Sequence, residues 1–205
     1  MRRPEFIARQ SAHPSGILGK VIVWVMERET AAQNDAALAA LAINPRDRIL
    51  EIGFGHGRTL EQLVAATPSG SVAGLDHSSE MYEMARRRCA PLLQSGRLAL
   101  RLGNSKALPY PDAYFDKVLA VHTIYFWDNP TEHLRELHRV MKSRAVCVLG
   151  FRPEEDPHAA SFPETVYRFY SREVVRDLLF DVGFANIDIS EPVPGLVLAR
   201  AVKQS

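Results

Sequence analysis

The stretch that decides the fold reads Ile49-Leu50-Glu51-Ile52-Gly53-Phe54-Gly55-His56-Gly57-Arg58-Thr59-Leu60. An apolar run precedes three alternating glycines, and a helix-forming segment follows them. Glycine lacks a Cβ atom, so a loop of this kind can turn tightly and bring its backbone close to a ligand. The pattern predicts a strand, a ligand-binding loop and a helix; the alternative is a glycine-rich turn without a ligand.

A carboxylate follows at the distance that a nucleoside site requires. Val72-Ala73-Gly74-Leu75-Asp76 is typical of the next strand, and a carboxylate at the end of that strand can accept hydrogen bonds from the hydroxyls of a ribose. The alternative role for Asp76 is the N-cap of a helix predicted over Ser79–Leu93. The dinucleotide fingerprint would have glycine where Arg58 stands, which argues against an NAD-dependent oxidoreductase.

The rest of the chain alternates short apolar runs with helical stretches, which predicts a doubly wound α/β fold with helices on both faces of a mostly parallel sheet. Only Glu191 to Gly195 separate the last two strands, so we expect them to form an antiparallel hairpin. The predicted strands are Arg48–Ile52, Ser71–Leu75, Leu98–Leu102, Lys117–Val121, Ala145–Leu149, Asn186–Ile189 and Leu196–Ala201. The predicted helices are Thr59–Ala66, Ser79–Leu93, Thr131–Met141 and Arg172–Val182.

The first part of the chain, residues 1–44, is expected to be a helical extension of a domain that spans residues 45–205. Apolar residues recur at helical spacing from Ile17, and the helical pattern continues to about Leu41. We expect this extension, which contains Trp24, to fold over the site as a lid or to pack against the domain. The alternative is an interfacial helix on a membrane.

Composition excludes several classes of function. The 205 residues carry 25 basic and 24 acidic side chains, a net charge of +1 that does not favour nucleic-acid binding. The two cysteines fit a reducing cytoplasm, and the apolar runs are too short for stable membrane insertion. His, Cys, Asp and Glu show no metal-ligand spacing, and we expect His133 and His138 on an exposed helix face.

The glycine loop, Asp76 and two later segments together resemble class I S-adenosylmethionine (SAM)-dependent methyltransferases, and most closely the small-molecule group that includes quinone- and lipid-methylating enzymes. The later segments are Gly103-Asn104-Ser105-x-x-Leu108-Pro109-x-x-Asp112-x-x-Phe115-Asp116-x-Val118 and the tail Ser171-Arg172-x-Val174-x-x-Leu178-Leu179-x-x-Val182-Gly183-Phe184. The resemblance implies a seven-stranded sheet of order 3-2-1-4-5-7-6 with strand 7 antiparallel, in agreement with the expected hairpin. It also implies SAM as the cofactor.

Cofactor contacts are carried over residue by residue from this resemblance. It implies that Asp76 holds the ribose and that the other residues line the methionine, ribose or adenine of SAM. These residues are Glu51, Gly53, Gly55, Gly57, His77, Met81, Asn104, Ser105 and His122. The family usually has Asp where Asn104 stands; the Asn oxygen can still accept from the adenine amine, through a neutral hydrogen bond.

The residues after the fourth predicted strand supply the candidates for catalysis. His122 is the leading candidate for a general base by its position and its ordinary pKa, with Tyr125 beside it; the alternative for His122 is a hydrogen-bonded core residue. Aromatic side chains are expected to line the acceptor pocket or to pack as core. They are Trp24, Tyr125, Phe126, Trp127, Phe162 and Tyr167.

The predicted function is methyl transfer from SAM to a small, partly apolar acceptor. One alternative is a SAM-binding regulatory module without catalysis, for which Asn104 is the only indication, and another is the NAD-dependent oxidoreductase. A nucleic-acid or protein acceptor is disfavoured by the balanced charge. The sequence determines neither the acceptor atom nor the oligomeric state.

Overall fold

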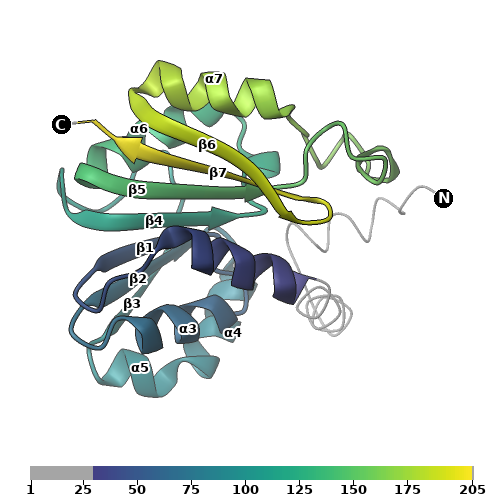
Figure 1. The fold of residues 1–205 in the computed structure, drawn as a ribbon. Coiled ribbons are helices and arrows are strands. Elements are labelled where there is room, and N and C mark those ends of the chain that lie inside the picture. The colour runs from purple at the N-terminus through teal and green to yellow at the C-terminus, as the bar shows by residue number, and fades with distance from the viewer. Residues whose placement is uncertain (1–29, 205) are drawn as a thin grey trace.

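The computed structural model describes residues 30–204, which form one seven-stranded sheet between two layers of helices (Figure 1). The strand order is β3-β2-β1-β4-β5-β7-β6, and β7 runs antiparallel to both β5 and β6. The expected fold class, strand order and hairpin are therefore confirmed. The strands are β1 Arg48–Ile52, β2 Ser71–Asp76, β3 Leu98–Leu102, β4 Phe115–Val121, β5 Met141–Phe151, β6 Phe184–Val193 and β7 Leu196–Lys203.

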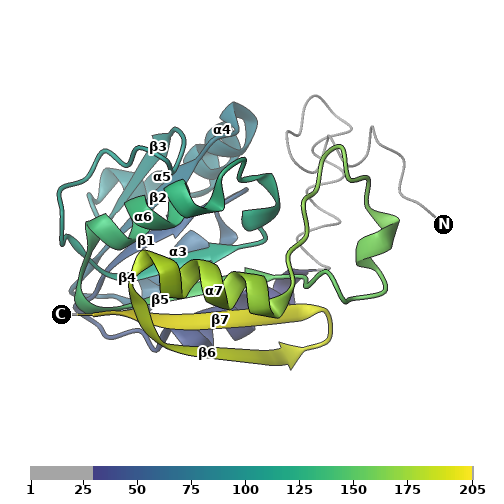
Figure 2. The same ribbon diagram turned by 90° about the horizontal axis from the view of Figure 1, so that it is seen from above.

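The helices cover both faces of the sheet, as Figures 1 and 2 show. One face packs against α3, α4, α5 and a helix over residues 30–41, and the opposite face packs against α6 and α7. The named helices are α3 Arg58–Ala66, α4 Ser79–Arg88, α5 Ala90–Gln94, α6 Pro130–Val140 and α7 Arg172–Val182, with short 3₁₀ turns η1 Ile124–Phe126 and η2 Ala159–Ser161.

Adjacent residues of one strand pack into different hydrophobic cores, one on each face of the sheet. Ile49 and Leu50 are both fully buried, but Ile49 packs under α3 and Leu50 packs on the side of α6. On β4, Val118 packs in the core on the side of α6, and Leu119 packs in the core under α3. Since successive side chains of a strand point to opposite faces, a strand covered on both sides is apolar throughout.

The helix predicted over Ser79–Leu93 is two helices, α4 and α5, which meet at Cys89. Pro91 explains the break, because proline inside a helix lacks the N–H donor and its ring clashes with the carbonyl four residues earlier. It is tolerated instead in the first turn of α5. The strand predicted over Ala145–Leu149 is also longer, since β5 begins directly after α6.

The N-terminal part is described from residue 30 onward, so Trp24 and the start of the helix predicted from Ile17 lie outside the described residues. Ala37 and Leu41 of the helix over residues 30–41 are fully buried against the sheet. Arg200 on β7 donates to the carbonyl of Ala40 at 3.2 Å. Within residues 30–204, no helix is both long and apolar enough to cross a membrane.

Gly74, in the middle of β2, makes room for the glycine loop. A Cβ atom at Gly74 would lie 2.6 Å from Cδ1 of Phe54, a loop residue that is only 3% exposed. We predict that Gly74→Ala lowers the free energy of unfolding by about 1–3 kcal/mol through overpacking. Gly103→Ala is the matched control, because its new Cβ would make an ordinary 3.6 Å contact with Leu75. Urea unfolding measures both, and equal stability of the two variants contradicts the prediction.

Candidate functional site

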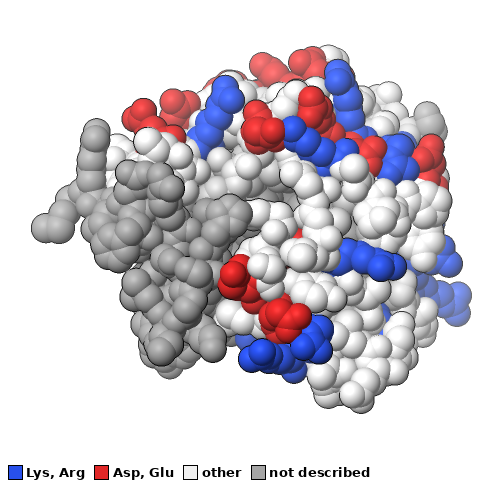
Figure 3. Space-filling model, turned by 180° about the vertical axis from the view of Figure 1, so that it is seen from behind, with Lys and Arg blue, Asp and Glu red and all other residues white. Residues whose placement is uncertain are grey.

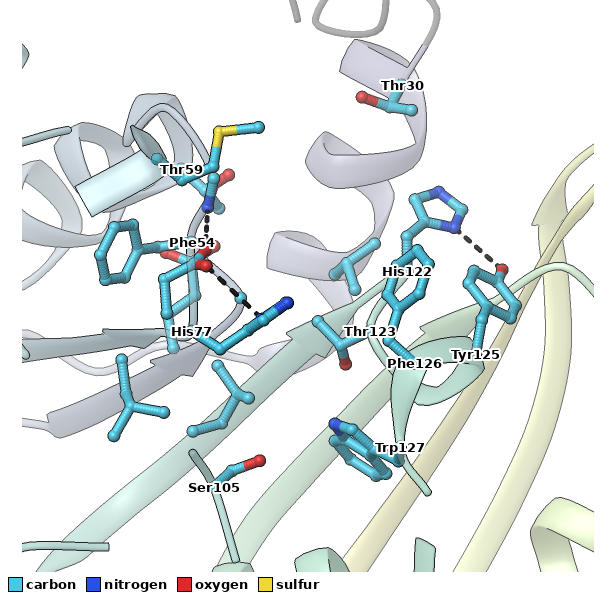
Figure 4. Close-up of a pocket in the computed structure, with 18 of the residues that line it drawn as sticks. Thr30, Phe54, Thr59, His77, Ser105, His122, Thr123, Tyr125, Phe126 and Trp127 are labelled. Atoms are coloured by element: carbon cyan, nitrogen blue, oxygen red, sulfur yellow. Dashed lines mark hydrogen bonds and ion pairs between the residues drawn. The ribbon is translucent and has the colours of Figure 1, made fainter. Parts of the chain in front are cut away.

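A cavity of about 330 Å³ lies at the carboxyl ends of β1, β2 and β4, where open α/β sheets bind ligands. Figure 4 shows Phe54 and His77 on one side, His122 and Tyr125 on the other, and Ser105 with Trp127 at the base. The predicted residues that line it are Glu51, Gly53, Gly55, Asp76, His77, Met81, Asn104, Ser105, His122, Tyr125, Phe126, Trp127, Phe162 and Tyr167. Among the described residues, no cluster of His, Cys, Asp and Glu could hold a metal ion.

The glycine loop packs against the segment that follows β4. Gly53 has a positive φ of 71°, and a Cβ atom there would lie 2.2 Å from Cγ2 of Thr123. Gly57 does not line the cavity, although it was expected to contact the cofactor. It is the N-cap of α3, and a Cβ there would lie 3.0 Å from Cβ of Ala85 on α4. Its role is to allow close packing of two helices.

Asp76, the last residue of β2, connects the glycine loop to this strand through a hydrogen bond. Its Oδ2 accepts a hydrogen bond from the Gly55 N–H at 2.9 Å, and its Oδ1 accepts one from the Ser78 N–H at 2.9 Å. Ser78 is the N-cap of α4, since its Oγ accepts from the Met81 N–H at 3.3 Å. The alternative role of Asp76 as the helix N-cap is therefore wrong. The carboxylate lies in the cavity wall with further acceptor capacity.

Two buried carboxyl groups, those of Glu51 and Asp76, make the end of the cavity beside the glycine loop acidic. Burial and the nearby charge of Asp76 raise the pKa of Glu51 to about 8, against a hydrogen bond from Thr59. Burial also raises the pKa of Asp76, while the Ser78 and Gly55 N–H groups oppose that shift. Within the described part of the chain, Oε2 of Glu51 has no hydrogen-bond partner. Such a pair favours a ligand that brings positive charge and hydrogen-bond donors.

His122 is held in a chain of hydrogen bonds across the cavity wall. Its Nε2 lies 2.7 Å from Oε1 of Gln33, and its Nδ1 lies 3.0 Å from the Tyr125 hydroxyl. Burial, and then the charge of Arg152, lower the pKa of His122 to about 4. The ring is therefore neutral, with Nε2–H donating to Gln33 and Nδ1 accepting from Tyr125.

Tyr125 continues the same chain. Its hydroxyl donates to His122 and accepts from the backbone N–H of Arg152, and burial raises its pKa above the ordinary value. The phenol stays protonated at neutral pH, as the imidazole stays neutral. Both side chains lie in the predicted place, but neither is suited to accept a proton there at neutral pH.

At the base of the cavity, Asn104 and Ser105 differ. Asn104 is exposed, and its side-chain oxygen accepts from the Lys106 N–H at 3.0 Å. Ser105 is 4% exposed, and its Oγ lies 2.7 Å from Nδ1 of His133. Nε2 of His133 lies 3.4 Å from Oδ1 of Asp128, and its ring stacks on Trp127 with a centroid distance of 4.8 Å.

The surface position expected for His133 is wrong, because the residue is only 3% exposed. The sequence does contain a signal for burial. His133 shares a helix face with Leu137 and Val140, four and seven residues later, and both are fully buried. His138, on the same helix, is half-buried beside Phe184.

The other end of the cavity is aromatic. The Tyr167 ring lies 5.0 Å from that of Phe126 and 4.9 Å from that of Phe162, between centroids. Phe162 and Tyr167 belong to the segment between β5 and α7, which projects beyond the carboxyl ends of the strands (Figure 2). Lining residues that were not predicted include Gln33, Asn34, Thr123 and Arg152.

Comparison with known proteins gives the same family at the levels of domain, sequence and fold. Residues 50–149 match the model of a methyltransferase domain. The chain is 28% identical to the uncharacterized methyltransferase YdaC of Bacillus subtilis, over 81% of this chain and 87% of that protein. It is 31% identical to the ubiquinone/menaquinone biosynthesis C-methyltransferase UbiE of Geotalea uraniireducens, over 68% of this chain and 71% of that protein.

A SAM-dependent methyltransferase from Aquifex aeolicus has the same fold, with a TM-score of 0.75 and 20% identity over 98% of this chain and 99% of that one. The chain spans only about half of some other curated relatives, 52% of one and 47% of another. The matched domain, the sequence identity and the strand order support the same family, and the cavity lies where this fold binds ligands. The chain belongs to the class I SAM-dependent methyltransferases, with SAM as its cofactor.

Proposed function

We propose that this enzyme methylates a small, partly apolar molecule that binds at the aromatic end of the cavity. One observation carries the proposal: a single cavity joins an acidic end, with Glu51 and Asp76, to an aromatic end, with Phe126, Phe162 and Tyr167. A charged nucleoside suits the first end, and a flat, partly apolar acceptor suits the second. SAM supplies an activated methyl group when it is bound.

Asp76 is the residue that we propose for the ribose hydroxyls, and Glu51 for the positively charged methionine part. The raised pKa values of both carboxyl groups support this assignment, since a bound cation would relieve an unfavourable pair of charges. His77 and Met81 are proposed to flank the adenine from the start of α4.

For the adenine amine, Ser105 is better supported than Asn104. Burial lowers the pKa of His133, so its ring is neutral. With Nε2–H directed at Asp128, Nδ1 accepts the Ser105 hydroxyl proton. The lone pairs of the Ser105 oxygen then remain for a donor in the cavity, whereas the Asn104 oxygen already accepts from the Lys106 N–H.

We propose that His122 and Tyr125 act by position and not by removing a proton. Their hydrogen bonds fix the wall between the two ends of the cavity. Holding two reactants in line can supply on the order of 7–11 kcal/mol of the barrier. Aromatic faces near the sulfonium add cation–π attraction.

The size and charge of the site favour a small-molecule acceptor. Figure 3 shows acidic and basic side chains interspersed over the described part of one face, which does not resemble the basic stripe of nucleic-acid-binding proteins. The UbiE relative is named for quinone biosynthesis, and an aromatic acceptor of that kind fits the aromatic end. Two buried free cysteines are compatible with a cytoplasmic enzyme.

Residues 1–44 are proposed to form the extension that covers this site, next to a domain over residues 45–205. Gln33, which bonds His122, and Asn34 both line the cavity from the helix over residues 30–41. These contacts of Gln33 and Asn34 support the proposal.

The direct test is incubation with methyl-labelled SAM and a fractionated small-molecule extract, followed by mass analysis of labelled products. We expect label in a small, partly apolar aromatic compound. Label only in RNA or protein fractions contradicts the small-molecule acceptor. Tight SAM binding with no labelled product in any fraction favours the regulatory module instead.

We predict that Asp76→Asn weakens binding of S-adenosylhomocysteine, the demethylated product, roughly 10- to 100-fold, since hydrogen bonds to a charged group are worth about 1.5–3 kcal/mol. Asp181→Asn is the matched control, because Asp181 is exposed at the end of α7. Calorimetric titration measures both variants, and thermal melting checks that each is folded. Unchanged affinity in Asp76→Asn removes the ribose assignment.

Glu51→Gln tests the buried carboxyl group through pH. The folded pKa of Glu51 is raised from 4.5 to about 8, so the folded state binds this proton more tightly and loses stability as pH rises through that window. We predict that Glu51→Gln stabilises the ligand-free protein by at least about 1 kcal/mol near pH 8 and much less near pH 5. The same variant should bind S-adenosylhomocysteine more weakly. A variant that is less stable than wild type near pH 8, or that binds equally well, contradicts this role.

A further inference from the structure

Arg152 brings a permanent positive charge to the aromatic end of the cavity. It follows the last residue of β5 directly and lines the cavity with Tyr125, Phe162 and Tyr167. Its charge contributes to the lowered pKa of His122, which lines the same cavity. Since arginine cannot be deprotonated in proteins, the aromatic end always contains a cation.

The Arg152 side chain is anchored on one side. Nη1 contacts Oδ2 of Asp156, and the backbone N–H donates to the Tyr125 hydroxyl. The turn between β6 and β7 lies on the side of Nη1, because a Cβ atom at Gly195 would approach both Nη1 and Oδ2 of Asp156 to 2.9 Å. This turn is tight, and Gly195 has a φ of 74°.

The anchor leaves donors of the guanidinium for a ligand. Within the described part of the chain, Asp156 is the ion-pair partner of Arg152, and it contacts one nitrogen of the fork. Asp156 is itself shared, because its Oδ1 accepts from the His158 N–H at 2.7 Å. Guanidinium carries five N–H donors in a geometry that suits planar oxygen anions. The Arg152 side chain is therefore held in place while some of its N–H donors have no hydrogen-bond acceptor among the described residues.

The two titratable groups of the hydrogen-bonded chain beside Arg152 are not suited to take a proton from an acceptor. His122 is a weak base, with a pKa lowered to about 4, and Tyr125 keeps its proton because burial raises its pKa. Glu51 and Asp76 belong to the opposite, acidic end. At the aromatic end, His122 and Tyr125 are therefore poor bases for an acceptor that must lose a proton, whereas Arg152 offers a cation to an acceptor that is already ionised.

We infer that the acceptor is an ionised aromatic or conjugated oxygen acid, recognised through its negative charge by Arg152. This inference rests on the proposed function of the site. A lone pair of the ionised acceptor forms the new bond to the methyl carbon while the carbon–sulfur bond breaks, and that bond's electron pair stays on sulfur as a neutral thioether. No proton is transferred in this step, so the charges balance without a base.

The test compares two probes of one shape, naphthalene carboxylate and naphthalene carboxamide, by calorimetric titration of the protein saturated with S-adenosylhomocysteine. We expect wild type to bind the carboxylate roughly tenfold more tightly than the amide, as charge-assisted hydrogen bonds are about twice as strong as neutral ones. Arg152→Gln should abolish this preference, and Arg152→Lys should retain part of it. Arg168→Gln, an exposed residue of the same segment, should retain all of it.

Equal binding of the two probes by wild type overturns the inference, and so does a preference that survives in Arg152→Gln. Thermal melting identifies a variant that fails to fold, and the comparison of probes on wild type decides the question in that case. Failure of S-adenosylhomocysteine to bind counts against the proposed function instead. Binding of that product without a preference for the anion refutes the role of Arg152 alone.

Discussion

The site depends on one carboxylate with two backbone partners. Asp76 accepts the N–H of Gly55 from the glycine loop and the N–H of Ser78 at the start of α4. These two bonds fix the loop after β1 and the helix after β2 relative to each other. Gly53 adds a third constraint, since the lack of a side chain allows the segment after β4 to pack against the loop. The acidic end of the cavity follows from these contacts.

The aromatic end is organised by neutral hydrogen bonds beside a fixed cation. Gln33, His122, Tyr125 and the backbone of Arg152 form a continuous chain. In a low-dielectric environment such a chain is rigid when every member has a partner. The cavity therefore separates binding of a charged nucleoside from binding of the acceptor. This division is consistent with an enzyme that contributes alignment more than proton transfer.

Sequence patterns predicted the fold class and the terminal hairpin, because buried strands are apolar throughout and the short link between β6 and β7 permits only a hairpin. The strand order followed from the resemblance to a known family. The patterns missed the break at Cys89, although Pro91 signals it, and the burial of His133. Gln33 and Arg152 were missed for another reason. Gln33 reaches His122 across a separation of 89 residues, and local patterns contain no information about such contacts. The cofactor contacts stay predictions.

We propose that the ribose of the cofactor binds Asp76 and that the reactive sulfur faces the aromatic end of the cavity. A crystal structure of the protein with S-adenosylhomocysteine tests this placement. We expect both ribose hydroxyls within hydrogen-bond distance of Asp76, with Ser105 at the adenine and the sulfur directed toward Phe126 and Tyr167. A nucleoside bound elsewhere, or a ribose turned away from Asp76 while its bond to Gly55 remains, would contradict it.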